Sequence, residues 1–437
     1  MAIAQKEEYK MSIQRQVFEF LKIAAQSHAR WEIETSMNIL RNRKKLLILL
    51  AMLTPILIVG LVSASDMIGG KEAYAPSFYS TYIFTVSIAI GLCAGLITGC
   101  IGAGGGFVIT PALMAAGVKG ILAVGTDLFH IFAKAIMGTA VHKKLGNVSG
   151  KLAIAFLVGS GGGTFIGGAI NKALYNYDPN LSDFFISTIY AVILGFLGFY
   201  SLIDFYRSSR SNKAVDAHGG TAGLTSLALS VQKINIPPSI TFDEDFVPGG
   251  RKISAVIVAL GGIVVGFLAS IMGVGGGFVT FPMFVYIFGV SSMTTVGTDI
   301  LQIIFTAGLG SIVQYAIYGF VFYTLAMGML LGSLIGIQIG ALTTKVVKGI
   351  HIRGFYAVSI LAGFVNRAAT LPKKLVEFEI IKVPKPTVNI IETTGNVMFW
   401  IVVGLFAVWV ISKFVMNINK LRAEEEYVTV PLVKREV

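Results

Sequence analysis

Three ionisable side chains recur at helical spacing inside an apolar stretch of this chain. Asp127, His130 and Lys134 are separated by three and four residues, which places them on one face of an α-helix. Ionisable groups in apolar helices usually face the interior of a helix bundle or a water-filled path. We therefore expect this polar stripe to carry protons, bind an ion or form a buried ion pair.

A second polar stripe occurs later in the chain, where Asp299 and Gln302 take the places of Asp127 and His130. Each aspartate follows a Gly-Thr pair at the start of an apolar segment, so Thr126 and Thr298 are candidate substrate contacts. One interpretation of the aspartates is simple helix capping, which the helix dipole favours. The other is a proton-carrying carboxyl group in each half of the protein.

Lys134 is the strongest single indication of function, because an unpaired ammonium group inside a membrane is energetically unfavourable. It can pair with Asp127, extend to the membrane surface or bind an anionic solute. We assign Lys134 and His130 to a candidate anion-binding group, with Gln302 as their counterpart in the second half.

Two glycine runs interrupt apolar segments. Consecutive glycines disfavour a helix, and a helix that restarts after them presents free backbone N–H groups that attract anions. Tight helix packing by small residues is the structural alternative. The candidate substrate-binding residues are Gly102, Gly104, Gly105, Gly106 and Phe107 in the first run and Gly273, Gly275, Gly276, Gly277 and Phe278 in the second.

The two halves of the chain repeat one another. The segment 102–108 recurs as 273–279, each followed by proline at the same distance, and Val-Gly-Thr-Asp at 124–127 recurs at 296–299. A Gly-Ser pair with later glycines at 159–167 recurs at 332–340. Glycine-rich composition alone would not preserve this order, so we predict two homologous repeats.

Composition places these repeats in a membrane. Hydrophobic residues make up 54% of the 437 residues and charged residues only 13%, against about 25% charged in soluble domains. The net charge of +12 comes from basic residues beside apolar segments, which indicates membrane topology and not nucleic-acid binding. We predict an all-α polytopic membrane protein.

The predicted order of segments follows from apolar runs and polar interruptions. It is an amphipathic and basic segment (1–45), an anchor helix (46–64), a first membrane repeat (78–206), a polar hairpin-like loop (207–252), a second membrane repeat (253–366), a second polar hairpin-like loop (367–396), and a final helix with a cytoplasmic tail (397–437).

The segments 106–118 and 277–289 are too short to span about 30 Å of hydrocarbon as helices. We expect them to be half-helices that follow the glycine breaks. Counting each as a crossing places most lysine and arginine residues on the inside, and the resulting odd number of crossings predicts inverted repeats.

The doubled Gly-x-Gly-Gly-Gly-Phe-Val run with its proline, the later Gly-Thr pair and the Gly-Ser helix together resemble the TauE/SafE sulfite exporter family. The resemblance covers roughly residues 80–200 and 255–365. It implies a multi-pass secondary transporter of the bacterial inner membrane for sulfite, a sulfonate or a related sulfur oxyanion, driven by protons. The aspartate after both Gly-Thr pairs departs from the family pattern, where an uncharged residue is common.

The alternatives are a passive anion channel, which would use the same sites, and an integral membrane sensor or enzyme subunit. No nucleophile or metal cluster and no nucleotide-binding loop occur in the sequence, so we expect no enzyme, no metal and no cofactor. The expected partners are a small sulfur-containing anion, protons and the lipid bilayer. Assembly into a homo-oligomer is left open.

Overall fold

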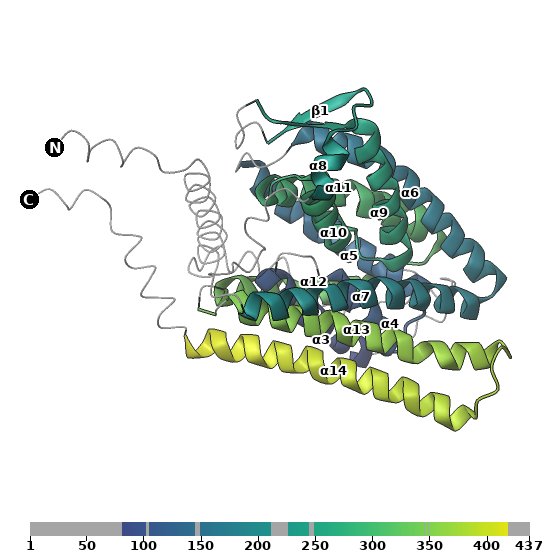
Figure 1. Ribbon diagram of the computed structural model, residues 1–437. Helices are drawn as coiled ribbons and strands as arrows, with labels where there is room; N and C mark the ends of the chain where they lie inside the picture. Colours follow the sequence, from purple (N-terminus) through teal and green to yellow (C-terminus); the bar gives the residue numbers. More distant parts are fainter. Residues whose placement is uncertain are drawn as a thin grey trace, which may run out of the picture.

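The described part of the chain is almost entirely helical. The computed structural model describes residues 81–101, 105–144, 149–210, 226–243, 249–344, 346–347 and 349–417. Across these ranges the backbone forms long helices and one small sheet (Figure 1), which confirms the all-α fold class. The predicted segments 1–45 and 46–64, and residues 418–437 of the predicted tail, lie outside the described residues.

The helices follow the same order in both halves of the chain. The first repeat contains α3 (Thr81–Ile101), α4 (Gly106–Ala115), α5 (Gly120–Lys144), α6 (Gly150–Tyr177) and α7 (Pro179–Arg210). The second contains α9 (Ala255–Met272), α10 (Gly277–Pro282) continued by the π-helix η2 (Met283–Phe288), α11 (Ser292–Leu309) continued by η3 (Gly310–Tyr315) and η4 (Ala316–Tyr318), α12 (Tyr323–Thr343) and α13 (Gly349–Glu377). The last helix is α14 (Lys385–Met416).

Within the described residues, eight helical stretches are long and apolar enough to cross a membrane. The two helices that follow the glycine runs, Gly106–Ala115 and Val279–Phe288, belong to a shorter apolar class. Ten helical residues extend only about 15 Å, half of a hydrocarbon core of about 30 Å. The prediction of short helices after both breaks is therefore confirmed.

Glycine seams join the first helix of each repeat to the fourth helix of the other. On α3 the facing pairs are Gly91 with Met329, Gly95 with Ser333 and Gly99 with Ile337 of α12. On α6 they are Gly159 with Ala259, Gly163 with Ile263 and Gly167 with Phe267 of α9. Residue numbers rise together in both seams, so each pair runs parallel. Glycine allows this contact because an added Cβ would meet the opposite backbone.

Two further pairs join equivalent helices of the repeats, and these run antiparallel. In α7 and α13, Gly195 lies against Phe364, Gly198 against Leu361 and Gly354 against Phe205. Between α5 and α11 with its continuation η3, Gly308 lies against Phe132 and Gly310 against Leu128. Exchanging the two repeats therefore turns the pair α3–α12 into the pair α9–α6. The pairs α5–α11 and α7–α13 are unchanged by the exchange. This is the pattern of a pseudo-twofold arrangement.

The first polar interruption contains the expected hairpin. A short helix, α8 (Ser226–Gln232), precedes the antiparallel strands β1 (Ser239–Phe242) and β2 (Arg251–Ser254). Figure 1 shows this hairpin at one end of the molecule, beside α8. Ile240, Phe242 and Ile253 point into a core shared with Phe284 and Phe288 of the second repeat, so apolar burial anchors the hairpin.

The prediction of a second hairpin-like loop at 367–396 is wrong. Helix α13 continues through Glu377 and α14 begins at Lys385, which leaves only residues 378–384 between them. The polar residues at the end of α13 belong to the helix because some of them are buried, including Arg367 and Thr370. The final helix accordingly starts at 385 and not at 397.

Large apolar side chains remain exposed along the outer helices. The exposed residues include Val192, Phe196 and Ile203 on α7 and Ile401 and Leu405 on α14. Helix α14 lies beside α13 along one edge of the molecule (Figure 1). A soluble monomer rarely exposes so much apolar surface. These faces are suited to contact with lipid chains.

Candidate functional site

The two glycine breaks lie against each other at the centre of the interface between the repeats. A Cβ atom added to Gly106 would come within 2.9 Å of the Val274 Cα, and one added to Gly273 would lie 2.8 Å from the Val124 Cα and 2.9 Å from the Thr110 Oγ1. The two breaks are therefore close together in the described part of the chain. Gly102 and Gly104 lie outside the described residues.

The second break requires glycine for a conformational reason as well. Gly273, Gly275 and Gly276 have φ values of 78°, 65° and 89°, a left-handed conformation that side chains with a Cβ rarely adopt. The chain thereby leaves α9 after Met272 and enters α10 at Gly277. Helices α4 and α10 both begin at these breaks, so the N-terminal ends of two helices, which carry a partial positive charge, lie there.

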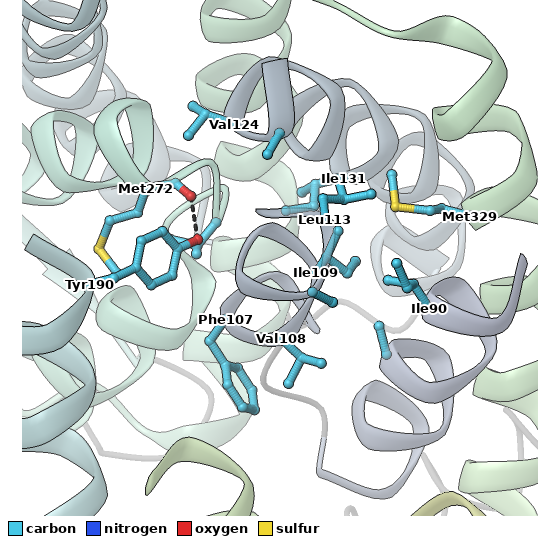
Figure 2. Close-up of a cluster of buried hydrophobic side chains, with 14 of the residues drawn as sticks. Ile90, Phe107, Val108, Ile109, Leu113, Val124, Ile131, Tyr190, Met272 and Met329 are labelled. Atoms are coloured by element: carbon cyan, nitrogen blue, oxygen red, sulfur yellow. Dashed lines mark hydrogen bonds between the residues drawn. The ribbon is translucent and has the colours of Figure 1, made fainter. Parts of the chain in front are cut away.

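An apolar shell surrounds the first short helix. Phe107 is fully buried and meets Tyr356 of α13 edge to face, with 5.6 Å between ring centroids. Figure 2 shows Val108 and Ile109 of α4 with Ile131 of α5 and Met329 of α12 around them. Of Phe278, the counterpart of Phe107, only the backbone is described, in the first turn of α10.

The first polar stripe connects the break region to the opposite repeat. The Thr110 hydroxyl donates to the Asp127 carboxylate over 3.0 Å, and the His130 Nε2 lies 2.9 Å from the hydroxyl oxygen of Ser333 on α12. The His130 Nδ1 is 3.7 Å from the other carboxylate oxygen of Asp127. All four side chains are buried, so Thr110, Asp127, His130 and Ser333 form one enclosed polar chain.

The second polar stripe forms the corresponding chain. The Gln302 amide donates to the Asp299 carboxylate over 2.8 Å, and the Thr306 hydroxyl donates to the Gln302 carbonyl oxygen over 2.8 Å. Thr306 in turn lies 2.9 Å from the hydroxyl of Ser160 on α6. A Cβ on Gly277 would lie 3.3 Å from the Asp299 carboxylate, so this chain also starts at a glycine break.

The two chains end on equivalent serines. Ser160 and Ser333 belong to the Gly-Ser pairs that recur in the sequence, and each contacts the polar stripe of the other repeat. Both buried polar chains therefore cross the boundary between the repeats. A relative movement of the repeats would change both chains together.

Lys134 is the residue of the first stripe whose polar group makes no hydrogen bond to any of the described residues. Its Nζ is buried and has no hydrogen-bond partner among the described residues, and the same holds for one Asp127 carboxylate oxygen and for the His130 Nδ1. Lys134 makes no direct contact with Asp127 among the described residues, although the two side chains are close enough to interact electrostatically. A buried ammonium group without a partner is strongly unfavourable, so this position is suited to receive an anion.

The hydroxyl groups of Thr126 and Thr298 accept hydrogen bonds from backbone N–H groups just before α12 and α6. The Thr126 hydroxyl accepts the N–H of Phe322, which precedes α12, over 2.9 Å. The Thr298 hydroxyl accepts the N–H of Ser149, which precedes α6, over 3.1 Å. The doubled Gly-Thr pairs thus fix, in each case, the helix of the opposite repeat that carries the partner serine.

Sequence reasoning missed several residues around the breaks. Thr110, Ser160 and Ser333 were not singled out, although the doubled Gly-Ser pair was a usable signal. Tyr190 of α7 donates a hydrogen bond to the Met272 carbonyl oxygen at the end of α9 (Figure 2). Arg367, assigned to a loop, lies buried in α13, where its Nε donates to the Asn366 side chain over 2.7 Å.

The fold and site define a class of protein: an integral membrane protein whose two helical repeats enclose paired broken helices and buried polar chains. Comparison with known families identifies it further. The pattern of the TauE/SafE sulfite exporter family matches residues 87–366, and the chain belongs to this family. It is therefore a membrane transporter and not an enzyme.

Curated relatives agree with this assignment. The chain is 27% identical over 270 residues to "Probable membrane transporter protein YunE" of Bacillus subtilis, covering 59% of this chain and 87% of the relative. It is 24% identical over 259 residues to "Probable membrane transporter protein YjnA" of the same organism, covering 58% and 87%. It is 26% identical over 204 residues to "Probable membrane transporter protein MJ0441" of Methanocaldococcus jannaschii, covering 45% of this chain and 59% of the relative. No solved structure matches the chain.

Proposed function

We propose that this transporter is a secondary carrier that moves sulfite, an organosulfonate or a related sulfur oxyanion across a bacterial inner membrane, coupled to protons. The observation that carries the proposal is the meeting of two glycine breaks against α5, the helix that also carries a buried lysine whose Nζ has no hydrogen-bond partner among the described residues. Helix N-termini and an ammonium group both favour a bound anion. The sulfur chemistry of the anion rests on the family.

The residue roles follow from the site. Lys134 and His130 attract the anion in the first repeat, and Gln302 donates in the second. The backbone of the two breaks supplies N–H groups, with Phe107 and Phe278 at the helix beginnings, and Thr126 and Thr298 at the edge of the site. Asp127 and Asp299 carry the coupled protons, because a carboxyl group close to an anion is tolerable chiefly when it is protonated.

The helix directions support an inverted relation between the repeats. Equivalent helices in the pairs α5 with α11 and α7 with α13 run antiparallel. If both members of a pair cross the bilayer, the pseudo-twofold axis lies in the membrane plane, as in many secondary transporters. Such a carrier exposes the central site alternately to either side.

Flux measurement tests this proposal. The purified full-length protein in proteoliposomes should take up radiolabelled sulfite with saturation, and an imposed pH gradient should drive accumulation. Asp299→Asn should retain sulfite binding and lose pH-driven accumulation, whereas Glu379→Gln, which removes an exposed carboxylate between α13 and α14, should behave like the parent protein.

The alternative outcomes are distinct. Flux that does not saturate and never exceeds the equilibrium distribution would indicate a passive anion channel. Saturable, pH-driven transport of a different anion, with no sulfite transport, would refute the sulfur oxyanion and leave the coupling intact.

A further inference from the structure

A cavity of about 270 Å³ lies outside the central site, between α8, the β1–β2 hairpin and the start of α9. Its polar lining comes from Gln232, Asn235, Ser239, Lys252 and Ser254. These side chains supply one ammonium group, two hydroxyl groups and two amides. Lys252 is the charged side chain among the described residues of this lining.

Among the polar residues that line the cavity, Ser254 is the most informative about the ligand. It caps the N-terminus of α9, yet its hydroxyl makes no capping hydrogen bond to the helix. The side chain is only 1% exposed, and its Oγ has no hydrogen-bond partner in the described part of the chain. A buried hydroxyl without a partner is unfavourable, so this position is suited to a ligand that can form a hydrogen bond.

The start of α9 adds to the same preference. The Ala255 N–H is bonded to the Pro238 carbonyl oxygen, and the following N–H groups of the first turn lack partners within the helix. A helix of 18 residues carries a partial positive charge at this end. The positive charge of Lys252, the hydroxyl of Ser254 and the helix N-terminus therefore all favour an anionic ligand.

We propose that this cavity is a second anion site that binds a small tetrahedral oxyanion of the phosphate or sulfate type. Oxyanions accept hydrogen bonds from a helix N-terminus, hydroxyls and an ammonium group at once. The oxyanion is either dissolved in water or the phosphate group of an anionic lipid. The site is separate from the central breaks and does not depend on the transported substrate.

The surrounding hairpin is fixed firmly enough to define such a site. The Gln232 amide donates to the Phe288 carbonyl oxygen over 2.7 Å. The Asp243 carboxylate accepts the Ser291 N–H over 2.8 Å and the Thr294 hydroxyl over 2.6 Å at the start of α11. Arg251 donates to the Gly289 carbonyl oxygen over 2.6 Å. The cavity wall is thus attached to the second repeat at several points.

Equilibrium dialysis with radiolabelled inorganic phosphate tests the site. The full-length protein is purified in a detergent without phosphate groups and titrated at constant ionic strength. Lys252→Gln and Ser254→Ala should each weaken phosphate binding roughly tenfold or more, because each removes a hydrogen bond to a charged group. Lys233→Gln removes the same charge from a neighbouring exposed position outside the cavity lining and should leave binding unchanged.

Two further measurements distinguish this cavity from the transport site, and a lipid phosphate from a dissolved oxyanion. Binding that persists in Lys134→Met but is weakened by Lys252→Gln belongs to this cavity and not to the transport site. In nanodiscs, phosphatidylglycerol should suppress phosphate binding relative to phosphatidylcholine if the lipid phosphate is the natural occupant, and should leave it unchanged if a dissolved oxyanion is.

Several results would overturn the proposal. These are an absence of saturable phosphate binding to the parent protein in detergent, binding to Lys252→Gln as tight as to the parent, and equal weakening by Lys233→Gln. Each would mean that the cavity is a solvated groove of the hairpin. None of them bears on whether sulfite is transported.

Discussion

Replacing Gly273 by alanine should destabilise the protein through two separate effects. The residue has a φ of 78°, and an L-residue with a Cβ pays roughly 1–2 kcal/mol for a left-handed conformation. The new Cβ would also lie 2.8 Å from the Val124 Cα and 2.9 Å from the Val124 carbonyl oxygen. Because these are backbone atoms, relief requires movement of α5, and overpacking of this kind costs about 1–3 kcal/mol.

The sum is a loss of about 2–5 kcal/mol in the free energy of unfolding. Gly404→Ala in α14 is the matched control, since an added Cβ there meets nothing within 4 Å. In that helix interior, alanine should be neutral or stabilising by up to about 1 kcal/mol. The thermal unfolding midpoints of both variants in the same detergent give the comparison.

The transport assay adds a second measure. Because Gly273 contacts α5 near Thr110, movement of that helix should displace Asp127 and reduce sulfite flux in Gly273→Ala. Gly404→Ala should transport normally. If the two variants unfold at the same temperature and transport equally, the close packing of the break against α5 is refuted.

Three other outcomes are expected. Lys134→Met should leave the protein folded, because it replaces a buried ammonium group that has no hydrogen-bond partner among the described residues. The variant should bind sulfite more weakly in a direct binding assay. Unchanged binding would assign the anion to the breaks alone. Ser333→Ala should remove the His130 contact of 2.9 Å and lower stability by about 1 kcal/mol, seen as a lower unfolding midpoint than that of Ser359→Ala, whose hydroxyl has no partner among the described residues. Cysteines at Lys233 and Lys382, which is exposed between α13 and α14, should react with an impermeant thiol reagent from opposite sides of the membrane; reaction from the same side would refute the inverted repeats.

Local sequence signals were sufficient for the repeats, the breaks and the first hairpin. Glycine runs disfavour helix wherever they occur, so the interruption before Gly106 and at Gly273 could be recognised without knowledge of the neighbours. The alternation in β1 of the exposed Ser239 with the buried Ile240 and Phe242 is likewise a local pattern. These features depend on residues close together in the chain.

The error at 367–396 shows where local signals fail. Lys382-Val383-Pro384 resembles the residues before the first hairpin, and the stretch is polar enough to suggest a loop. Polar residues nevertheless continue α13 because Arg367 and Thr370 are buried against other helices. Whether a polar side chain ends a helix or turns inward depends on what lies beside it in the fold.

The partners of the polar stripes could not be predicted for the same reason. The spacing of Asp127 and His130 shows that they share a face, but the sequence does not show that this face meets Ser333 on α12. That contact spans 203 positions and depends on the exchange of helices between the repeats. The sequence supplied the residues of the candidate site, and the packing of the helices decided which of them meet.

The two polar chains share a geometry but differ in charge, and this difference bears on the mechanism. In the second chain, Asp299 is bonded to the uncharged donor Gln302, which is bonded in turn to Thr306. In the first chain, the positions of Gln302 and Thr306 are taken by the ionisable residues His130 and Lys134. We therefore expect the anion to bind closer to the first repeat, and removal of positive charge at Lys134 to weaken binding more than Gln302→Leu. Equal weakening by the two variants, measured by direct sulfite binding, would instead place the anion midway between the repeats.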